Sequence, residues 1–116
     1  MSTARTILIA LGFVLWSGPT QAHARLDHAS PAAGSAVSSS PSEIALYFTE
    51  ELEPEFSGGE VRSAAGARVD HGANISGKAM RLGVGTLPPG NYTVSGHVTS
   101  VDTHKTQESF SFTVSK

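Results

Sequence analysis

One residue near the start of this sequence and two near its end could bind one metal ion together: His23, Asp102 and His104. If the chain is cut after Ala22, His23 becomes the first residue, and its α-amine and imidazole can both donate nitrogen atoms to one ion. Asp102 and His104 would add a carboxylate oxygen and a second imidazole. In an extended chain their spacing of two residues places both side chains on one face. Such a set of nitrogen and oxygen donors suits a tetragonal site, the geometry that favours Cu(II).

The N-terminal amine favours copper over rival metals. An α-amine has a reference pKa of about 8 and must lose its proton before it binds a metal ion. By the Irving–Williams order, Cu(II) achieves this more readily than other divalent first-row ions. Zinc prefers tetrahedral sites that are often built with cysteine, and the chain has no cysteine. We therefore predict one Cu(II) ion; the alternative is a turn in which Asp102 only hydrogen-bonds nearby backbone.

Residues 1–22 predict that His23 begins the mature protein. Arg5 precedes an apolar stretch of 11 residues at 6–16, and the segment ends in alanine, as signal peptides do. The apolar stretch is shorter than the roughly 20 residues of a membrane-spanning helix. A cut after Ala24 also fits the small-residue rule and would leave Arg25 first. We expect cleavage after Ala22, followed by one exported domain over residues 23–116.

The composition of that domain excludes several classes of function. Removing residues 1–22 takes away one arginine and no acidic residue, which leaves 7 basic against 10 acidic residues and a formal net charge of −3. Such a surface does not favour nucleic acid, which binds to basic patches. Without cysteine, the domain has neither disulfides nor a thiolate site. No motif supports a serine nucleophile, so we do not expect an enzyme.

Alternating apolar residues predict short strands. The alternation is strict at 43–49, 91–99 and 109–115. Weaker strand candidates lie at 25–29, 60–63, 67–70 and 79–82, and proline and glycine mark turns between the segments. About seven short strands in one small domain predict an all-β fold, an immunoglobulin-like antiparallel Greek-key sandwich or barrel. The predicted core is Leu26, Ile44, Leu46, Phe48, Val61, Val69, Leu82, Leu87, Tyr92, Val94, Val98, Phe110, Phe112 and Val114.

The remaining histidines have weaker patterns around them. His28 lies in the predicted first strand, where it is either a surface residue or an additional ligand near the site. His71 lies in a segment with the composition of a turn, and His97 has the phase of the polar face of its strand. We expect both to face water. Met80 is the only methionine after residue 22 and is expected to fill the core.

Several segments in the same order resemble CopC-type periplasmic copper-resistance proteins. The matching segments are 23–35, which begins with histidine and contains Ser-Pro-Ala-Ala-Gly, 46–50 (Leu-Tyr-Phe-Thr-Glu), 87–94 (Leu-Pro-Pro-Gly-Asn-Tyr-Thr-Val), 98–104 (Val-Thr-Ser-Val-Asp-Thr-His) and 110–114 (Phe-Ser-Phe-Thr-Val). Together they span nearly the whole chain after residue 22. The chain departs from the family pattern at Lys105–Glu108, where the family usually has proline and then glycine.

The resemblance implies a ligand set and a cellular role. By this resemblance, the Cu(II) ligands of the family correspond to His23, Asp102 and His104. The glutamate that the family places just outside its ligand set corresponds to Glu50. Glu50 is equally well explained as one member of the acidic segment 50–55. A single methionine cannot build the soft Cu(I) site that some members carry. The resemblance implies a periplasmic protein that sequesters copper or delivers it to a membrane partner of the CopD type.

Two other functions stay open at this stage. An N-terminal histidine chelate also resembles that of copper-dependent polysaccharide monooxygenases, which would make the protein an oxidative enzyme. The other function is that of a metal-free immunoglobulin-like interaction module. In the leading interpretation we expect a monomer whose mature domain does not insert into the membrane.

Overall fold

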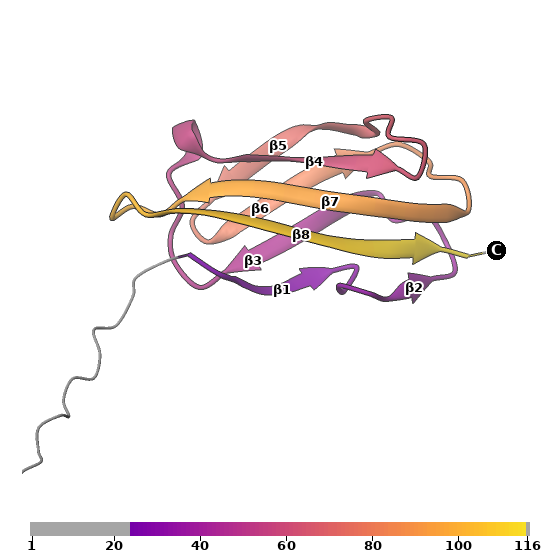
Figure 1. Cartoon of the computed structure of the whole chain (residues 1–116), viewed down its shortest axis with the longest axis horizontal. Coiled ribbons are helices and arrows are strands. Elements are labelled where there is room, and N and C mark those ends of the chain that lie inside the picture. Colours follow the sequence, from indigo (N-terminus) through magenta and orange to yellow (C-terminus); the bar gives the residue numbers. More distant parts are fainter. Residues whose placement is uncertain (1–23, 116) are drawn as a thin grey trace, which may run out of the picture.

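A computed structural model describes residues 24–115 as two four-stranded sheets packed face to face (Figure 1). The first sheet has the order β1 (Leu26–Ser30), β3 (Glu43–Phe48), β6 (Ala79–Val84), β5 (Asp70–Ser76). The second has the order β2 (Ala36–Val37), β8 (Lys105–Val114), β7 (Gly90–Thr99), β4 (Gly58–Ser63). One 3-10 turn, η1 (Pro54–Phe56), precedes β4. The predicted all-β sandwich is confirmed.

The topology differs from the prediction in two details. Eight strands are formed within residues 24–115 where about seven were expected, and the additional strand is the two-residue β2. The β2–β8 pair is parallel, whereas the other strand pairs of both sheets are antiparallel. The Greek-key description of the connections stays a prediction. No helix within the described range is long and apolar enough to cross a membrane.

The core lies between the two sheets, because the alternating strands point their apolar side chains towards that space. Ile44, Leu46 and Phe48 of β3 are buried, as the strict alternation predicted. The other predicted core residues are also buried, except Leu26, Val69 and Phe110, which pack partly buried against the core. Met80 is fully buried, as expected. Sequence patterns did not identify Ala24, Ala45, Leu52 and Val84, which are also buried.

The strand predicted at 67–70 was placed too early in the chain. Residues 63–67 form a tight hairpin turn, in which Ser63 N–H donates to Ala67 O at 2.8 Å and Gly66 has a φ of +89°. The continuous strand β5 begins only at Asp70. His71 therefore lies in β5 and not in a turn, although its side chain is exposed as expected. His97 is exposed on β7, also as expected.

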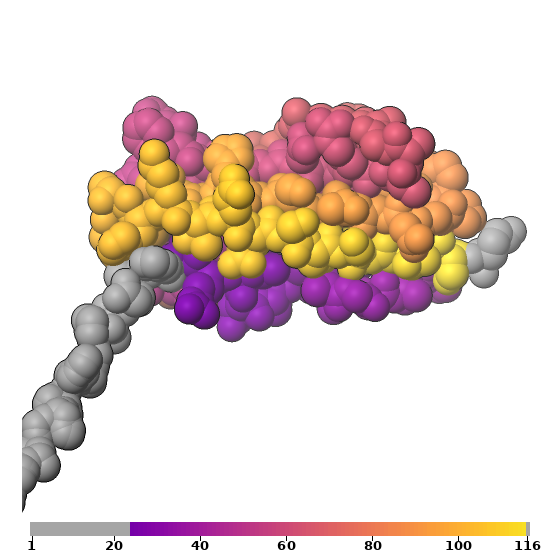
Figure 2. All heavy atoms as spheres, in the orientation of Figure 1, coloured from indigo at the N-terminus to yellow at the C-terminus, as the bar shows by residue number. Residues whose placement is uncertain are grey.

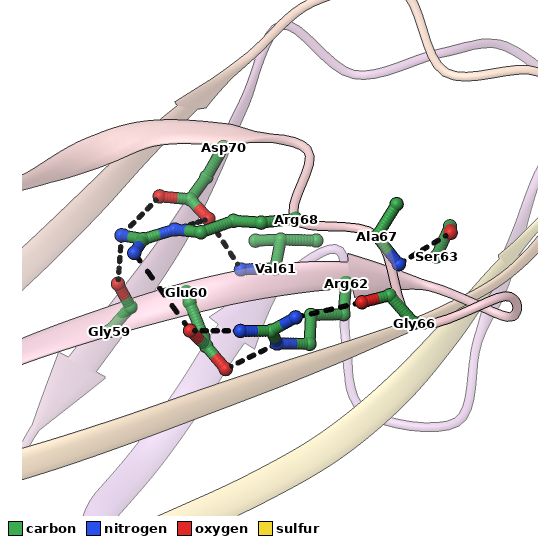
Figure 3. Close-up of polar contacts among 9 residues, drawn as sticks. All are labelled: Gly59, Glu60, Val61, Arg62, Ser63, Gly66, Ala67, Arg68 and Asp70. Carbon is green, nitrogen blue, oxygen red and sulfur yellow. Dashed lines mark hydrogen bonds and ion pairs between the residues drawn. The ribbon is translucent and has the colours of Figure 1, made fainter.

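A buried carboxylate joins β5 to β4 (Figure 3). The side chain of Asp70 is 0% exposed and accepts hydrogen bonds from Arg68 Nε at 2.9 Å and from the backbone N–H groups of Val61 and Gly72 at 2.8 and 2.9 Å. Burial by itself would raise the pKa of Asp70. The hydrogen bonds from Arg68, Val61 and Gly72 outweigh burial and lower this pKa to about 2.

We predict that Asp70→Asn lowers the free energy of unfolding by about 2–3 kcal/mol at pH 7, because a pKa lowered from 3.8 to about 2 corresponds to that much stabilisation. The folded-state pKa lies below the unfolded one. The contribution is therefore complete above about pH 4 and is lost as the pH falls towards 2. Urea unfolding of both proteins at pH 7 and pH 2–4 checks both statements.

The matched control is Glu43→Gln. Glu43 pairs with Arg81 at 2.8 Å, but both side chains are nearly half exposed, so this variant should cost less than about 1 kcal/mol. Equal losses in the two variants would contradict the special role of Asp70.

Candidate metal centre

The loop that joins β7 to β8 carries two of the three predicted ligands, Asp102 and His104. The loop is closed by Ser100 N–H donating to His104 O at 2.9 Å and by Thr103 N–H donating to Ser100 O at 2.8 Å. Thr103 has a φ of +74°, which lies in the left-handed region. The assumption of an extended chain at 102–104 was therefore wrong: the segment forms a turn, in which the Asp102 side chain contacts the side chains of Ser100 and His104 as well as backbone.

The turn nevertheless brings the two side chains together. His104 Nδ1 lies 3.2 Å from Asp102 Oδ1. This is the separation of a hydrogen bond or ion pair, so both donor atoms lie close enough to face a single ion. The side chains of Asp102 and His104 are 41% and 48% exposed, so an ion can reach both from solvent.

The surroundings of Asp102 keep its carboxyl group ionised. Ser100 Oγ donates a hydrogen bond to Asp102 Oδ1, and the backbone N–H and the side chain of His104 also contact the carboxyl group. The Ser100 bond, followed by the contacts with His104, holds the pKa of Asp102 below its usual value. Metal ligation requires this deprotonated form.

The third predicted ligand, His23, lies outside the described residues, but the chain directly after it is firmly held. Ala24 is fully buried in the core. Arg25 N–H donates to Thr49 Oγ1 at 3.0 Å, and Thr49 N–H donates back to Arg25 O at 2.9 Å. Leu26 N–H donates to the Glu108 carboxylate at 3.3 Å. These bonds fix the start of β1 between β3 and β8.

The segment after β3 connects the start of β1 to the ligand loop. Its first residue, Thr49, bonds to Arg25, and two residues later Glu51 O accepts a hydrogen bond from Val101 N–H at 3.1 Å. Glu53 N–H then donates to Thr99 O at 2.8 Å. The start of β1 and the β7–β8 loop therefore lie at the same end of the sandwich, as Figure 1 shows. In Figure 2 the indigo atoms of the first described residues lie against the yellow atoms of β8.

Glu50 lies between the two attachment points of this segment. Its neighbours Thr49 and Glu51 bond to Arg25 and to Val101, respectively, and Glu50 is half-buried. Of the other glutamates in this acidic segment, Glu51 and Glu55 are exposed and Glu53 is half-buried like Glu50, so its place between the two attachment points is what distinguishes Glu50.

The described residues alone do not complete a metal site. Within residues 24–115, no group of three or more histidine, cysteine, aspartate or glutamate side chains could hold an ion. His28 is engaged elsewhere, because its Nδ1 lies 2.7 Å from Asp27 Oδ2. Its ring also stacks on that of Tyr47, with 4.5 Å between the ring centroids. His97 lies against Gly58 of the neighbouring strand. The position of His23 therefore decides whether the predicted site is complete.

Sequence patterns missed three residues that organise this end of the molecule. Ser100 lies in the matched segment 98–104, and its spacing of two residues from Asp102 is the signal that could have identified it as a partner of that carboxylate. Glu108 has the phase of the inner face of β8, where a carboxylate is unusual. Thr49 is exposed and lies in the matched segment 46–50, but nothing in that segment indicated a bond to Arg25.

Comparisons with known proteins identify the family of this chain. The model of the CopC domain matches residues 26–115. Protein YobA of Escherichia coli K12 is 36% identical over 124 residues, which cover 97% of this chain and 98% of YobA. Copper resistance protein C of Pseudomonas syringae pv. tomato is 33% identical over 122 residues, which cover 97% of this chain and 95% of that protein.

Solved structures that superpose on this chain include CopC and PcoC proteins. CopC from Methylosinus trichosporium OB3b superposes with a TM-score of 0.76 at 31% identity, over 80% of this chain and 94% of that chain. PcoC, a methionine-rich copper resistance protein of Escherichia coli, superposes with a TM-score of 0.72 at 31% identity, over 80% of this chain and 99% of that chain. The sandwich, the order of the motifs and these matches together show that this chain belongs to the CopC family.

Proposed function

We propose that this protein binds one Cu(II) ion in the periplasm and either sequesters it or delivers it to a membrane partner of the CopD type. The observation that supports this most directly is the 3.2 Å contact between His104 Nδ1 and Asp102 Oδ1, at the end of the sandwich where the described chain begins. The family match and the copper resistance proteins among the relatives support a role in copper resistance or homeostasis.

The proposed site combines these two side chains with the amine and imidazole of His23. The carboxylate of Asp102 offsets part of the charge of the ion, and the three nitrogen donors match the preference of Cu(II). For His23 to contribute its amine, residues 1–22 must be removed, so we propose a mature domain of residues 23–116. It would act as a monomer, without nucleic acid and without insertion into the membrane.

The burial of Met80 supports a site for Cu(II) rather than Cu(I). Cu(I) prefers soft thioether and thiolate ligands. Met80 is the only methionine after residue 22 and is 0% exposed in the core, and the chain has no cysteine. In this respect the chain differs from PcoC, which is methionine-rich.

We propose binding rather than catalysis. A copper-dependent polysaccharide monooxygenase would present a broad and often aromatic substrate face. Within residues 24–115 Tyr92 is buried and Tyr47 is half-buried, and the largely exposed Phe56 on η1 does not make a broad face by itself. The carboxylate of Asp102 would also occupy a position that oxygen needs. Sustained peroxide production by the copper-loaded protein with a reductant would favour the enzyme instead.

We predict that His104→Ala and Asp102→Ala each weaken Cu(II) binding by more than about a hundredfold, because loss of a ligand should exceed the 10–100-fold effect typical of outer residues. The protein must begin at His23, and competition with a chromogenic chelator at pH 7 gives the affinity. His97→Ala is the control and should bind as the unchanged protein does. Unchanged affinity in His104→Ala would support the metal-free interaction module.

The free amine of His23 gives a second prediction. A protein that keeps Ala22 as its first residue places an amide where the amine should bind, so its Cu(II) affinity should fall and its EPR spectrum should change. Affinity should also fall steeply as the pH drops, since protons compete for the nitrogen ligands. Mass spectrometry of the exported form should find His23 first; a chain that begins at Arg25 would refute the site.

The half-buried position of Glu50 leads us to propose that it acts as an outer residue of the site. We predict that Glu50→Gln lowers Cu(II) affinity by about tenfold, the smaller end of the range for such residues. Glu51→Gln is the matched control, because it removes the same charge from an exposed neighbour. Equal affinities in the two variants would make Glu50 an ordinary member of the acidic segment.

A further inference from the structure

We propose that Ser100 is a positioning residue that holds the Asp102 carboxylate ready for copper without contacting the ion itself. This inference rests on the proposed function. Ser100 Oγ donates its hydrogen bond to Asp102 Oδ1, which is the same oxygen that lies 3.2 Å from His104 Nδ1.

Ser100 is suited to this role because its own position is fixed. The residue is 1% exposed. Its backbone forms a bridge to Leu52 and donates to His104 O at 2.9 Å, where the β7–β8 loop closes. The hydroxyl group therefore extends from a buried, doubly attached backbone towards the partly exposed Asp102.

Such a fixed donor matters because Asp102 stands in an exposed turn. Without the Ser100 bond only the contacts with His104 would hold this carboxylate, and the additional ordering would oppose metal binding. With Ser100 in place, this ordering occurs when the protein folds and not when the ion arrives. Residues that orient ligands in this way commonly change metal affinity by 10–100-fold.

Thr103 offers a matched control in the same turn. Its Oγ1 donates to the backbone oxygen of Asp102 and not to the carboxylate. Removal of the Thr103 hydroxyl therefore deletes a hydrogen bond of the turn and leaves the orientation of the carboxylate untouched. Ser100→Ala, by contrast, keeps the backbone bond to His104 and deletes the hydroxyl group, with its bond to the Asp102 carboxylate and its longer contact of 3.4 Å with His104 O.

We expect Ser100→Ala to weaken Cu(II) binding by about 10–100-fold and to change the EPR spectrum of the copper-loaded protein. Thr103→Ala should stay within about twofold of the unchanged protein. Each variant begins at His23, and affinity is measured by chelator competition at pH 7. Equal losses in Ser100→Ala and Thr103→Ala would overturn the proposal, because a general effect on the turn would then explain both.

A double-mutant cycle separates positioning from a merely structural role. If Ser100 acts through Asp102, then Ser100→Ala should cause no further loss in the Asp102→Ala background. A loss of the same size in both backgrounds would overturn the proposal. Full affinity in Ser100→Ala, while Asp102→Ala binds weakly, would overturn this inference alone. Full affinity in Asp102→Ala would overturn the proposed function as well.

A measurement on the unchanged protein keeps the inference testable even if Ser100→Ala does not fold. NMR three-bond couplings of Asp102 in the metal-free protein should report a single χ1 rotamer, because the Ser100 hydrogen bond holds the side chain. Couplings averaged over several rotamers would overturn the proposal.

Discussion

The candidate site depends on one short run of backbone pairing, in which residues 49–53 contact both the start of β1 and the β7–β8 loop. Thr49 exchanges hydrogen bonds with Arg25, while Glu51 and Glu53 bond to Val101 and Thr99. More than seventy residues of chain separate the two regions that this segment joins. Apart from the Thr49 hydroxyl, these bonds join backbone groups and use none of the candidate ligand side chains, so the assembly of this end does not require a bound ion.

Much of the fold could be predicted because alternation carries its signal locally. Ile44, Leu46 and Phe48 point to the core because successive residues of a strand face opposite sides. The start of β5 could not be predicted in this way. There the buried Asp70 carboxylate, held by its near neighbours Arg68 and Gly72 and by Val61 of β4, marks where the strand begins, and local alternation gives no sign of the contact with β4.

The candidate site, too, could be predicted only in part. Residue types and spacing sufficed to select Asp102 and His104 as a pair, and the structure places their donor atoms in contact. The spacing argument assumed a strand, whereas a turn with Thr103 in the left-handed region brings the two side chains together. The contribution of Ser100 depends on its burial beside Leu52, which only the folded chain provides. Short motifs thus identify donor atoms, and tertiary packing identifies what holds them.

The length and direction of β8 have a practical consequence for handling the molecule. This strand leaves the ligand loop at Lys105 and runs ten residues to Val114, a distance of about 30 Å at the rise of a β-strand. The C-terminal end of the described chain consequently lies at the opposite end of the sandwich, as Figure 1 shows. Affinity tags, fluorophores or surface-immobilisation handles joined after β8 would stay remote from the end that carries Asp102 and His104.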